Sequence, residues 1–111
     1  MESSPVILAV GTECPPEAEE EFHKWYEKHV SDLLQFKGAK RAARLKLLGA
    51  KEGKYPQYLA VYEFESRQAA EAYADTPTHY AAIEEWNNTL GKRGAKITWR
   101  AHYQLMKTWQ K

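Results

Sequence analysis

The sequence predicts one α+β domain over residues 1–111, a ferredoxin-like βαββαβ arrangement with a four-stranded antiparallel sheet. Three observations support this. Four strand-like stretches alternate with two amphipathic helices in the order that this fold requires. Two of the stretches, Val6–Val10 and Tyr58–Phe64, are apolar at nearly every residue, which is typical of central strands buried on both faces. The length of 111 residues also suits one such domain.

The first predicted strand and helix occupy the N-terminal third of the chain. Val6–Val10 is an unbroken apolar run that Gly11 is expected to end. The predicted helix, Glu17–Phe36, opens on an acidic cluster, and negative charge there favours the positive end of the helix dipole. Lys37 followed by Gly38 is a typical end for a helix.

The next two strands form a predicted hairpin. Arg41–Leu48 is mixed in polarity, as expected of an edge strand, and Gly49–Pro56 has the glycines and proline of a loop. Tyr58–Phe64 is apolar on both faces except for Glu63.

The second helix and the last strand complete the fold. Ser66 is the expected N-cap of the helix, which is interrupted around Asp75–Pro77 because proline stops or kinks a helix. It resumes over 78–90. Lys96–Lys107 alternates as a strand, with one face carrying Ile97, Trp99, Ala101, Tyr103 and Leu105 and the other Thr98, Arg100, His102, Gln104 and Met106.

In this arrangement the first and third strands are central and the other two are edges. The helices cover only one face of the sheet, yet the central strands are apolar on both. The second face therefore needs a cover, and the simplest cover is another copy of the chain. We expect a homodimer packed sheet to sheet.

Composition and missing motifs exclude several classes of protein. The net charge of +1 gives no general attraction to nucleic acid, and no apolar stretch or N-terminal signal points to a membrane or to secretion. The sequence therefore predicts a soluble, cytoplasmic protein with no nucleic-acid or membrane partner. Cys14 is the single cysteine, and no metal or nucleotide motif is present, so no metal site is predicted.

His29 is the most informative residue. At about 100° per residue it lies in the apolar stripe of the first helix, close to Phe22, Trp25 and Leu33. A titratable imidazole is thus predicted to face the core. It is either a structural histidine with a hydrogen-bond partner or the wall of a pocket between helix and sheet.

The segment Phe22–Val30, followed by Gly38 and a strand bearing Arg41 and Arg44, resembles the dimeric α+β barrel superfamily. That group includes EthD-like proteins, antibiotic-biosynthesis monooxygenases, polyketide cyclases and muconolactone-type isomerases. The break at Thr76–His79 is similar to a turn in many relatives. The resemblance covers essentially the whole chain and implies a ligand cavity between the helices and the sheet of each subunit.

The resemblance implies that the inner helix faces line this cavity. His29 is then the candidate general base, and Tyr26 or His79 could donate or hold a proton. Glu63 is a further candidate acid or base because it interrupts an apolar strand, although it could instead pair with Arg44, Arg100 or a lysine. The expected substrate-binding residues are Phe22, Trp25, Arg44, Tyr62, Ile83 and Trp86, of which the two tryptophans could equally be plain core.

The leading hypothesis is a cofactor-independent enzyme that uses acid–base chemistry on an aromatic or polyketide-like small molecule. Cyclisation, isomerisation, dehydration or lactone opening would serve secondary metabolism or aromatic degradation. The alternatives are a cofactor-free oxygenase of phenols, a haem-binding or haem-degrading protein with His79 as axial ligand, and a non-catalytic dimeric ligand-binding protein. An RNA-binding module shares the βαββαβ order, but the third strand lacks its glycine-rich start.

Overall fold

The strands and helices follow the predicted βαββαβ order in a computed structural model that describes residues 4–111. The second helical region is divided into two helices, and two short 3₁₀ turns, η1 and η2, precede α1 and β4. The elements are β1 (Val6–Glu13), η1 (Pro16–Ala18), α1 (Glu19–Leu33), β2 (Ala39–Lys46), β3 (Tyr58–Phe64), α2 (Arg67–Ala74), α3 (Pro77–Asn88), η2 (Leu90–Arg93) and β4 (Lys96–Gln104).

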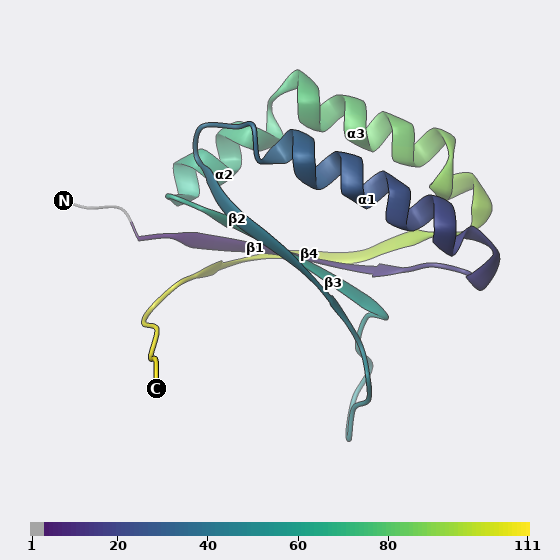
Figure 1. The fold of residues 1–111 in the computed structure, drawn as a ribbon, viewed down its shortest axis with the longest axis horizontal. Coiled ribbons are helices and arrows are strands. Elements are labelled where there is room, and N and C mark those ends of the chain that lie inside the picture. The colour runs from purple at the N-terminus through teal and green to yellow at the C-terminus, as the bar shows by residue number, and fades with distance from the viewer. Residues whose placement is uncertain (1–3) are drawn as a thin grey trace.

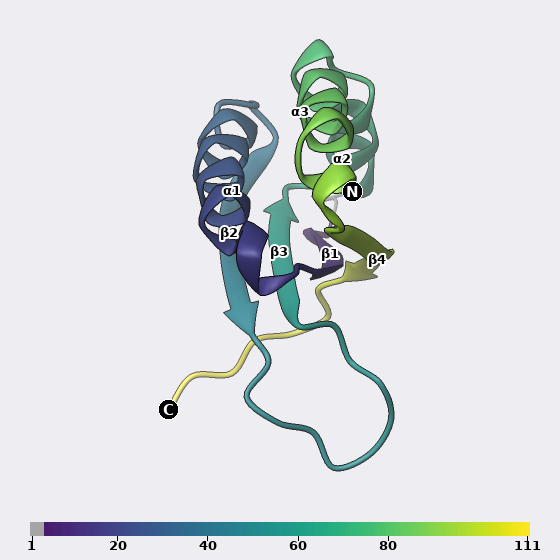
Figure 2. The same ribbon diagram turned by 90° about the vertical axis from the view of Figure 1, so that its right-hand side faces the viewer.

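The four strands form one antiparallel sheet in the order β2-β3-β1-β4. The two apolar strands, β1 and β3, are central, which confirms the ferredoxin-like prediction. All three helices lie on one side of the sheet, and the C-terminal tail leaves on the other (Figures 1 and 2). We call these two sides of the sheet the helix face and the open face.

Strand β1 continues through Gly11 to Glu13, so the prediction that Gly11 ends it is wrong. A Cβ at Gly11 would lie 2.8 Å from Trp99 Nε1 on β4 and 3.0 Å from Pro56. The glycine therefore permits a close approach between neighbours instead of making a turn.

A bulge follows at this point, because Gly11 pairs with Trp99 and Thr12 with Ile97, which leaves Thr98 as an extra residue in β4. Ile97 consequently turns to the helix face and packs against the core. The prediction that it shares a face with Trp99 is wrong.

Several other boundaries differ from the predicted ones by two or three residues, whereas β3 spans 58–64 as predicted. Pro15 and Pro16 lead into η1, so α1 begins at Glu19 instead of Glu17. It ends at Leu33 instead of Phe36 because the amides of residues 35 and 36 bond three residues back, to the carbonyls of 32 and 33. Strand β2 spans 39–46 instead of 41–48, and β4 ends at 104 instead of 107.

Side-chain caps explain the break between α2 and α3. Ser66 Oγ accepts a hydrogen bond from the Ala69 amide at 3.1 Å, as the predicted N-cap should. Thr76 Oγ1 accepts from the His79 amide at 3.2 Å, and Pro77 occupies the first turn of α3. The chain therefore stops one helix and starts another.

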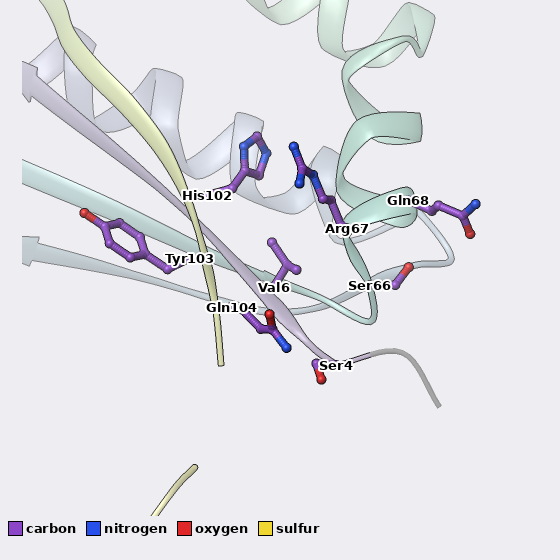
Figure 3. A pocket seen from close by; sticks show the side chains of 8 residues that line it. All are labelled: Ser4, Val6, Ser66, Arg67, Gln68, His102, Tyr103 and Gln104. Carbon is purple, nitrogen blue, oxygen red and sulfur yellow. The ribbon is translucent and has the colours of Figure 1, made fainter. Parts of the chain in front are cut away.

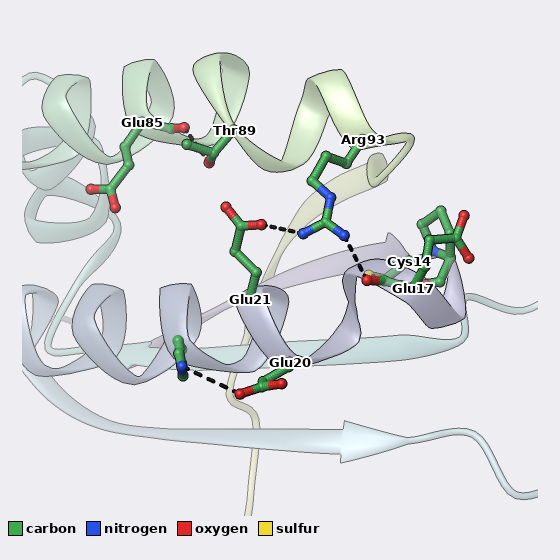
Figure 4. A network of polar contacts seen from close by, with 9 residues as sticks. Cys14, Glu17, Glu20, Glu21, Glu85, Thr89 and Arg93 are labelled. Carbon is green, nitrogen blue, oxygen red and sulfur yellow. Dashed lines mark hydrogen bonds and ion pairs between the residues drawn. The ribbon is translucent and has the colours of Figure 1, made fainter.

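The core lies between the helix face and the helices. Its fully buried large side chains include Phe22 and Leu33 from α1, Tyr62 and Phe64 from β3, and Leu90 from η2. At the far end of the helix layer, Arg93 contacts the Glu21 carboxylate and donates to the Glu17 carbonyl at 2.6 Å (Figure 4). Within 4–111, no helix is long and apolar enough to cross a membrane.

Candidate active site

His29 lies on the inner side of α1 and is only 9% exposed. Its ring stacks on Trp25, with centroids 4.6 Å apart and planes 23° apart, and it meets the edge of Tyr62 at 5.7 Å. The Nδ1 atom is buried and has no hydrogen-bond partner among the described residues. Buried polar atoms are normally paired, so this nitrogen is an unsatisfied hydrogen-bonding group.

The surroundings of His29 keep its imidazole neutral. Burial lowers its pKa to about 4 from the ordinary value of 6.5, and the nearby His79 lowers it further, whereas the Asp32 carboxylate opposes the shift. At neutral pH His29 is therefore an uncharged group with a free nitrogen lone pair or N–H.

A cleft of about 360 Å³ opens between α1 and α3, with His29 in its wall. Small-molecule pockets commonly measure about 300–1,000 Å³. An ion pair joins the two helices at the cleft, with Lys28 Nζ 3.2 Å from the Glu85 carboxylate. The cleft is lined by Trp25, Lys28, His29, Asp32, Gln35, Thr78, Ala81, Ala82 and Glu85.

His79 lies in the first turn of α3, half-buried between the rings of Tyr73 at 5.4 Å and Tyr80 at 6.0 Å. Its Nδ1 and the Tyr73 hydroxyl are also buried without a partner among the described residues. Burial lowers the pKa of His79, and the Arg100 cation adds to this effect. His79 does not line the cleft.

Tyr26 and Arg44 lie on the other flank of α1. The Arg44 guanidinium lies 4.2 Å from the centre of the Tyr26 ring. Burial raises the pKa of Tyr26, and Thr12 and Arg44 oppose that shift. Phe22, fully buried, packs edge to face against Tyr26 and Trp86. None of these side chains lines the cleft.

Glu63 lies on the open face, separated from His29 by the sheet, because it alternates with the core residues Tyr62 and Phe64. It is 8% exposed and pairs with Arg41 Nε at 3.2 Å and Lys40 Nζ at 3.6 Å. The fold therefore does not bring Glu63 together with the histidines, and the lysine pairing considered from the sequence occurs.

The predicted residues thus occupy several separate places. His29 and Trp25 line the cleft, while Tyr62 and His79 lie beside His29. Ile83, half-buried on α3, and Trp86 belong to the helix layer, Tyr26 and Arg44 lie on the far flank of α1, and Glu63 is on the open face.

Sequence reasoning missed Asp32, Thr78, Tyr73 and Arg100. Asp32 follows His29 by almost one helical turn, so the spacing could have indicated that they are neighbours. Arg100 pairs with Val10 of the core, which places it on the helix face. Arg100 and His102, which pair with Val10 and Leu8, therefore point away from the open face.

Another hollow of about 460 Å³ lies between β4 and the start of α2 (Figure 3). His102 and Arg67 extend into the same space from the two elements, but Arg67 already pairs with Glu71 at 3.0 Å. Within the described residues, no group of three or more histidine, cysteine or acidic side chains could hold a metal ion.

Solved structures share this fold over nearly their whole length. A candidate antibiotic biosynthesis monooxygenase from Deinococcus radiodurans has a TM-score of 0.73 and 13% identity, covering 95% of this chain and 96% of its own. An EthD family protein from Bacillus halodurans has a TM-score of 0.64 and 13% identity, with coverage of 93% and 99%. A dimeric ferredoxin-like protein of unknown function from Thermobifida fusca has a TM-score of 0.63 and 18% identity, covering 93% and 92%.

These similarities confirm the predicted fold. They also confirm the predicted resemblance to EthD-like and monooxygenase-like proteins. No curated protein matches the sequence. The family described as "Domain of unknown function (DUF4286)" matches residues 5–98, and the chain belongs to that family.

Proposed function

We propose that this protein is a cofactor-independent enzyme that moves a proton on a small aromatic or polyketide-like molecule held in the cleft between α1 and α3. The observation that carries the proposal is the neutral His29, with an unpartnered buried Nδ1 in the aromatic wall of a cleft of about 360 Å³. Trp25, which stacks on His29, also lines the cleft and offers a surface for a flat ligand.

His29 serves as the base in this reaction. It accepts a proton from an acidic C–H or from a phenol, and the imidazolium that forms is balanced by the new enolate or phenolate beside it. Because burial disfavours a charged imidazole, the proton transfer requires that anion to be adjacent. Returning the proton to another carbon of the ligand gives isomerisation. In cyclisation the enolate carbon attacks a carbonyl carbon of the same ligand and the proton goes to the alkoxide that forms. In elimination the bond to a leaving group breaks and the proton goes to that group.

The first experiment measures binding and turnover with a panel of small phenols, β-diketones and lactones. NMR titration of the histidine ring carbons should show that a bound acidic ligand raises the pKa of His29 above about 4, because the ligand supplies the counter-charge. His29→Gln should abolish turnover, with a loss of at least about 100-fold, as expected for a general base.

His102→Gln is the matched control, because His102 is an exposed histidine on β4 outside the cleft. It should leave binding and turnover unchanged. Ligand binding without any turnover would indicate a non-catalytic binding protein. If no panel member binds, or if His29→Gln behaves as the control does, the acid–base proposal is wrong.

A cofactor-free oxygenase of phenols is the second candidate, and one specific observation favours it. Structural neighbours include candidate antibiotic biosynthesis monooxygenases. The same base would generate an electron-rich phenolate, which molecular oxygen then oxidises. Oxygen uptake on addition of a bound phenol, lost in His29→Gln, distinguishes this reaction from isomerisation, which consumes no oxygen.

We further propose that two copies pack through the open face. Support comes from an apolar groove on that face and from the dimeric Thermobifida fusca neighbour. Light scattering should give a dimer at micromolar concentration, and Val61→Lys should give a monomer, whereas Asn87→Lys on exposed α3 should remain dimeric. A monomeric wild-type protein would contradict this. The groove is lined by Ile7, Ala9, Leu59, Val61, Trp99, Tyr103, Gln104, Leu105, Met106, Lys107 and Trp109.

A further inference from the structure

A separate cavity of about 300 Å³ lies between α1 and the edge strand β2. It is on the opposite flank of α1 from the cleft that His29 lines, because α3 borders one flank and β2 the other (Figure 2). Its lining combines small apolar residues with an aromatic ring, one cation and one carboxylate: Tyr26, Glu27, Val30, Ala42, Ala43 and Arg44.

The cation, Arg44, is held rigidly by aromatic rings. Its guanidinium carbon lies 4.2 Å from the centre of the Tyr26 ring, 5.3 Å from that of Phe22 and 5.7 Å from that of Tyr58. Such cation–π contacts fix the position of the group without neutralising its charge. The guanidinium is therefore oriented before any ligand arrives.

One of the two terminal nitrogens of the Arg44 guanidinium has a hydrogen-bond partner among the described residues and the other has none. Arg44 Nη1 lies 3.1 Å from His23 Nδ1, and since arginine can only donate, His23 Nδ1 accepts this hydrogen bond. Arg44 Nη2 is buried and has no partner among the described residues. A buried donor left unpaired is costly, and a charged one more so.

Arg44 also lacks a counter-ion. No carboxylate of residues 4–111 lies within 4.0 Å of it, whereas Arg41, Arg67 and Arg93 each pair with a glutamate. A partly buried charge is normally paired. The chain thus presents a fixed cation, with a free N–H donor, beside a cavity.

We propose that this cavity binds a small organic monocarboxylate, which accepts a hydrogen bond from Arg44 Nη2 and lays its apolar body against Val30 and Ala42. One cation balances one negative charge, and Glu27 in the cavity lining disfavours a polyanion such as phosphate. The small side chain of Ala42 leaves the room that the apolar body occupies. This site is independent of the acid–base reaction proposed for the other flank of α1.

Calorimetry with benzoate and hexanoate, and with benzamide as the uncharged counterpart, tests the proposal on the whole protein. Both carboxylates should bind and benzamide should not. Arg44→Gln should weaken carboxylate binding at least about tenfold, the usual effect of losing a charge-assisted hydrogen bond. Lys46→Gln removes an exposed cation from the same strand and should change the affinity by less than about twofold.

NMR amide shifts locate the ligand in the wild-type protein, so the test survives if Arg44→Gln does not fold. Carboxylate should shift the amides of residues 26–30 and 42–44. Arg44→Lys keeps the charge without the planar fork and should bind more weakly but detectably. Shifts confined to 78–85 would place the ligand in the His29 cleft and overturn this proposal alone. Equal binding of phosphate, or no binding, would also overturn it.

Discussion

The two sides of the sheet differ in whether their buried polar groups have partners. On the helix face, His29, His79 and Tyr73 each bury a polar atom that has no partner among the described residues. On the open face, Glu63 is as well buried as His29 but pairs with two cations. Unpaired buried polar atoms lower the free energy of unfolding, so these groups destabilise the helix side of the sheet. Such places are commonly functional.

The apolar groups differ as well. Large rings fill the space under the helices, where Phe22, Tyr62 and Phe64 are almost completely buried. The open face instead carries half-exposed residues such as Leu59 and Val61, and aromatic side chains such as Trp99 that remain 38% exposed. The helix face is part of a closed core, whereas the open face is the surface that the partner copy proposed above would cover.

The largest expected effect separates the two faces directly. Phe22→Ala should lower the free energy of unfolding by about 3–5 kcal/mol, because it leaves a cavity in the closed core. Leu59→Ala should cost about 1 kcal/mol in the monomer, since Leu59 is only half-buried. Urea unfolding at several protein concentrations measures both. A cost for Leu59→Ala that grows with concentration would mean that the open face is covered.

The second effect concerns pH and the unpaired imidazole. The folded chain holds the pKa of His29 near 4 instead of 6.5, so between these values it binds fewer protons than the unfolded chain. The stability from this group is complete above pH 6.5 and is lost as the pH falls through 6.5 toward 4. The gap corresponds to roughly 3 kcal/mol.

Urea unfolding of wild type and His29→Gln from pH 7 to pH 4 measures this contribution. The variant should lose less stability over that range than wild type does, and His102→Gln should keep the wild-type slope. Parallel curves for wild type and His29→Gln would contradict the low pKa and, with it, the neutral base of the proposed reaction.

A smaller effect is expected on the open face. Glu63→Gln removes a charge whose partners, Lys40 and Arg41, are 46% and 76% exposed in their side chains. Exposed ion pairs contribute little, so we expect a loss of about 1 kcal/mol or less. Glu65→Gln, an exposed neighbour, is the control for the change in net charge. A loss of several kcal/mol would mean that Glu63 is buried more deeply in solution, as in a dimer.

The smallest effect concerns the two tyrosine hydroxyls. Tyr73→Phe should change the free energy of unfolding by less than about 0.5 kcal/mol, or raise it, because the hydroxyl it removes has no partner. Tyr58→Phe should cost about 1 kcal/mol, because that hydroxyl donates to Glu19 at 3.0 Å. A large cost for Tyr73→Phe would reveal a water or ligand bonded to it.

The fold was predictable from the sequence because its main signals are local. Two nearly all-apolar runs identified the central strands, the Ser66 cap identified the start of α2, and the proline at 77 identified the break between α2 and α3. The position of His29 on the buried stripe of α1 followed from helical periodicity alone. The prediction was wrong where the role of a residue depends on a neighbour far away in the sequence. Gly11, for example, is needed for the close approach of Trp99.

The site needed the tertiary structure, because it is a matter of which faces meet. Periodicity says that Glu63 interrupts an apolar strand, but only the register shows that it lies across the sheet from His29. Likewise, the two flanks of α1 border two different cavities. The sequence alone does not show that Trp25 lines one cavity and Tyr26 the other, or that the Arg44 guanidinium lies over the Tyr26 ring. The sequence determined the elements and the buried imidazole, whereas packing decided which polar groups are paired, because pairing depends on distances between segments far apart in the chain.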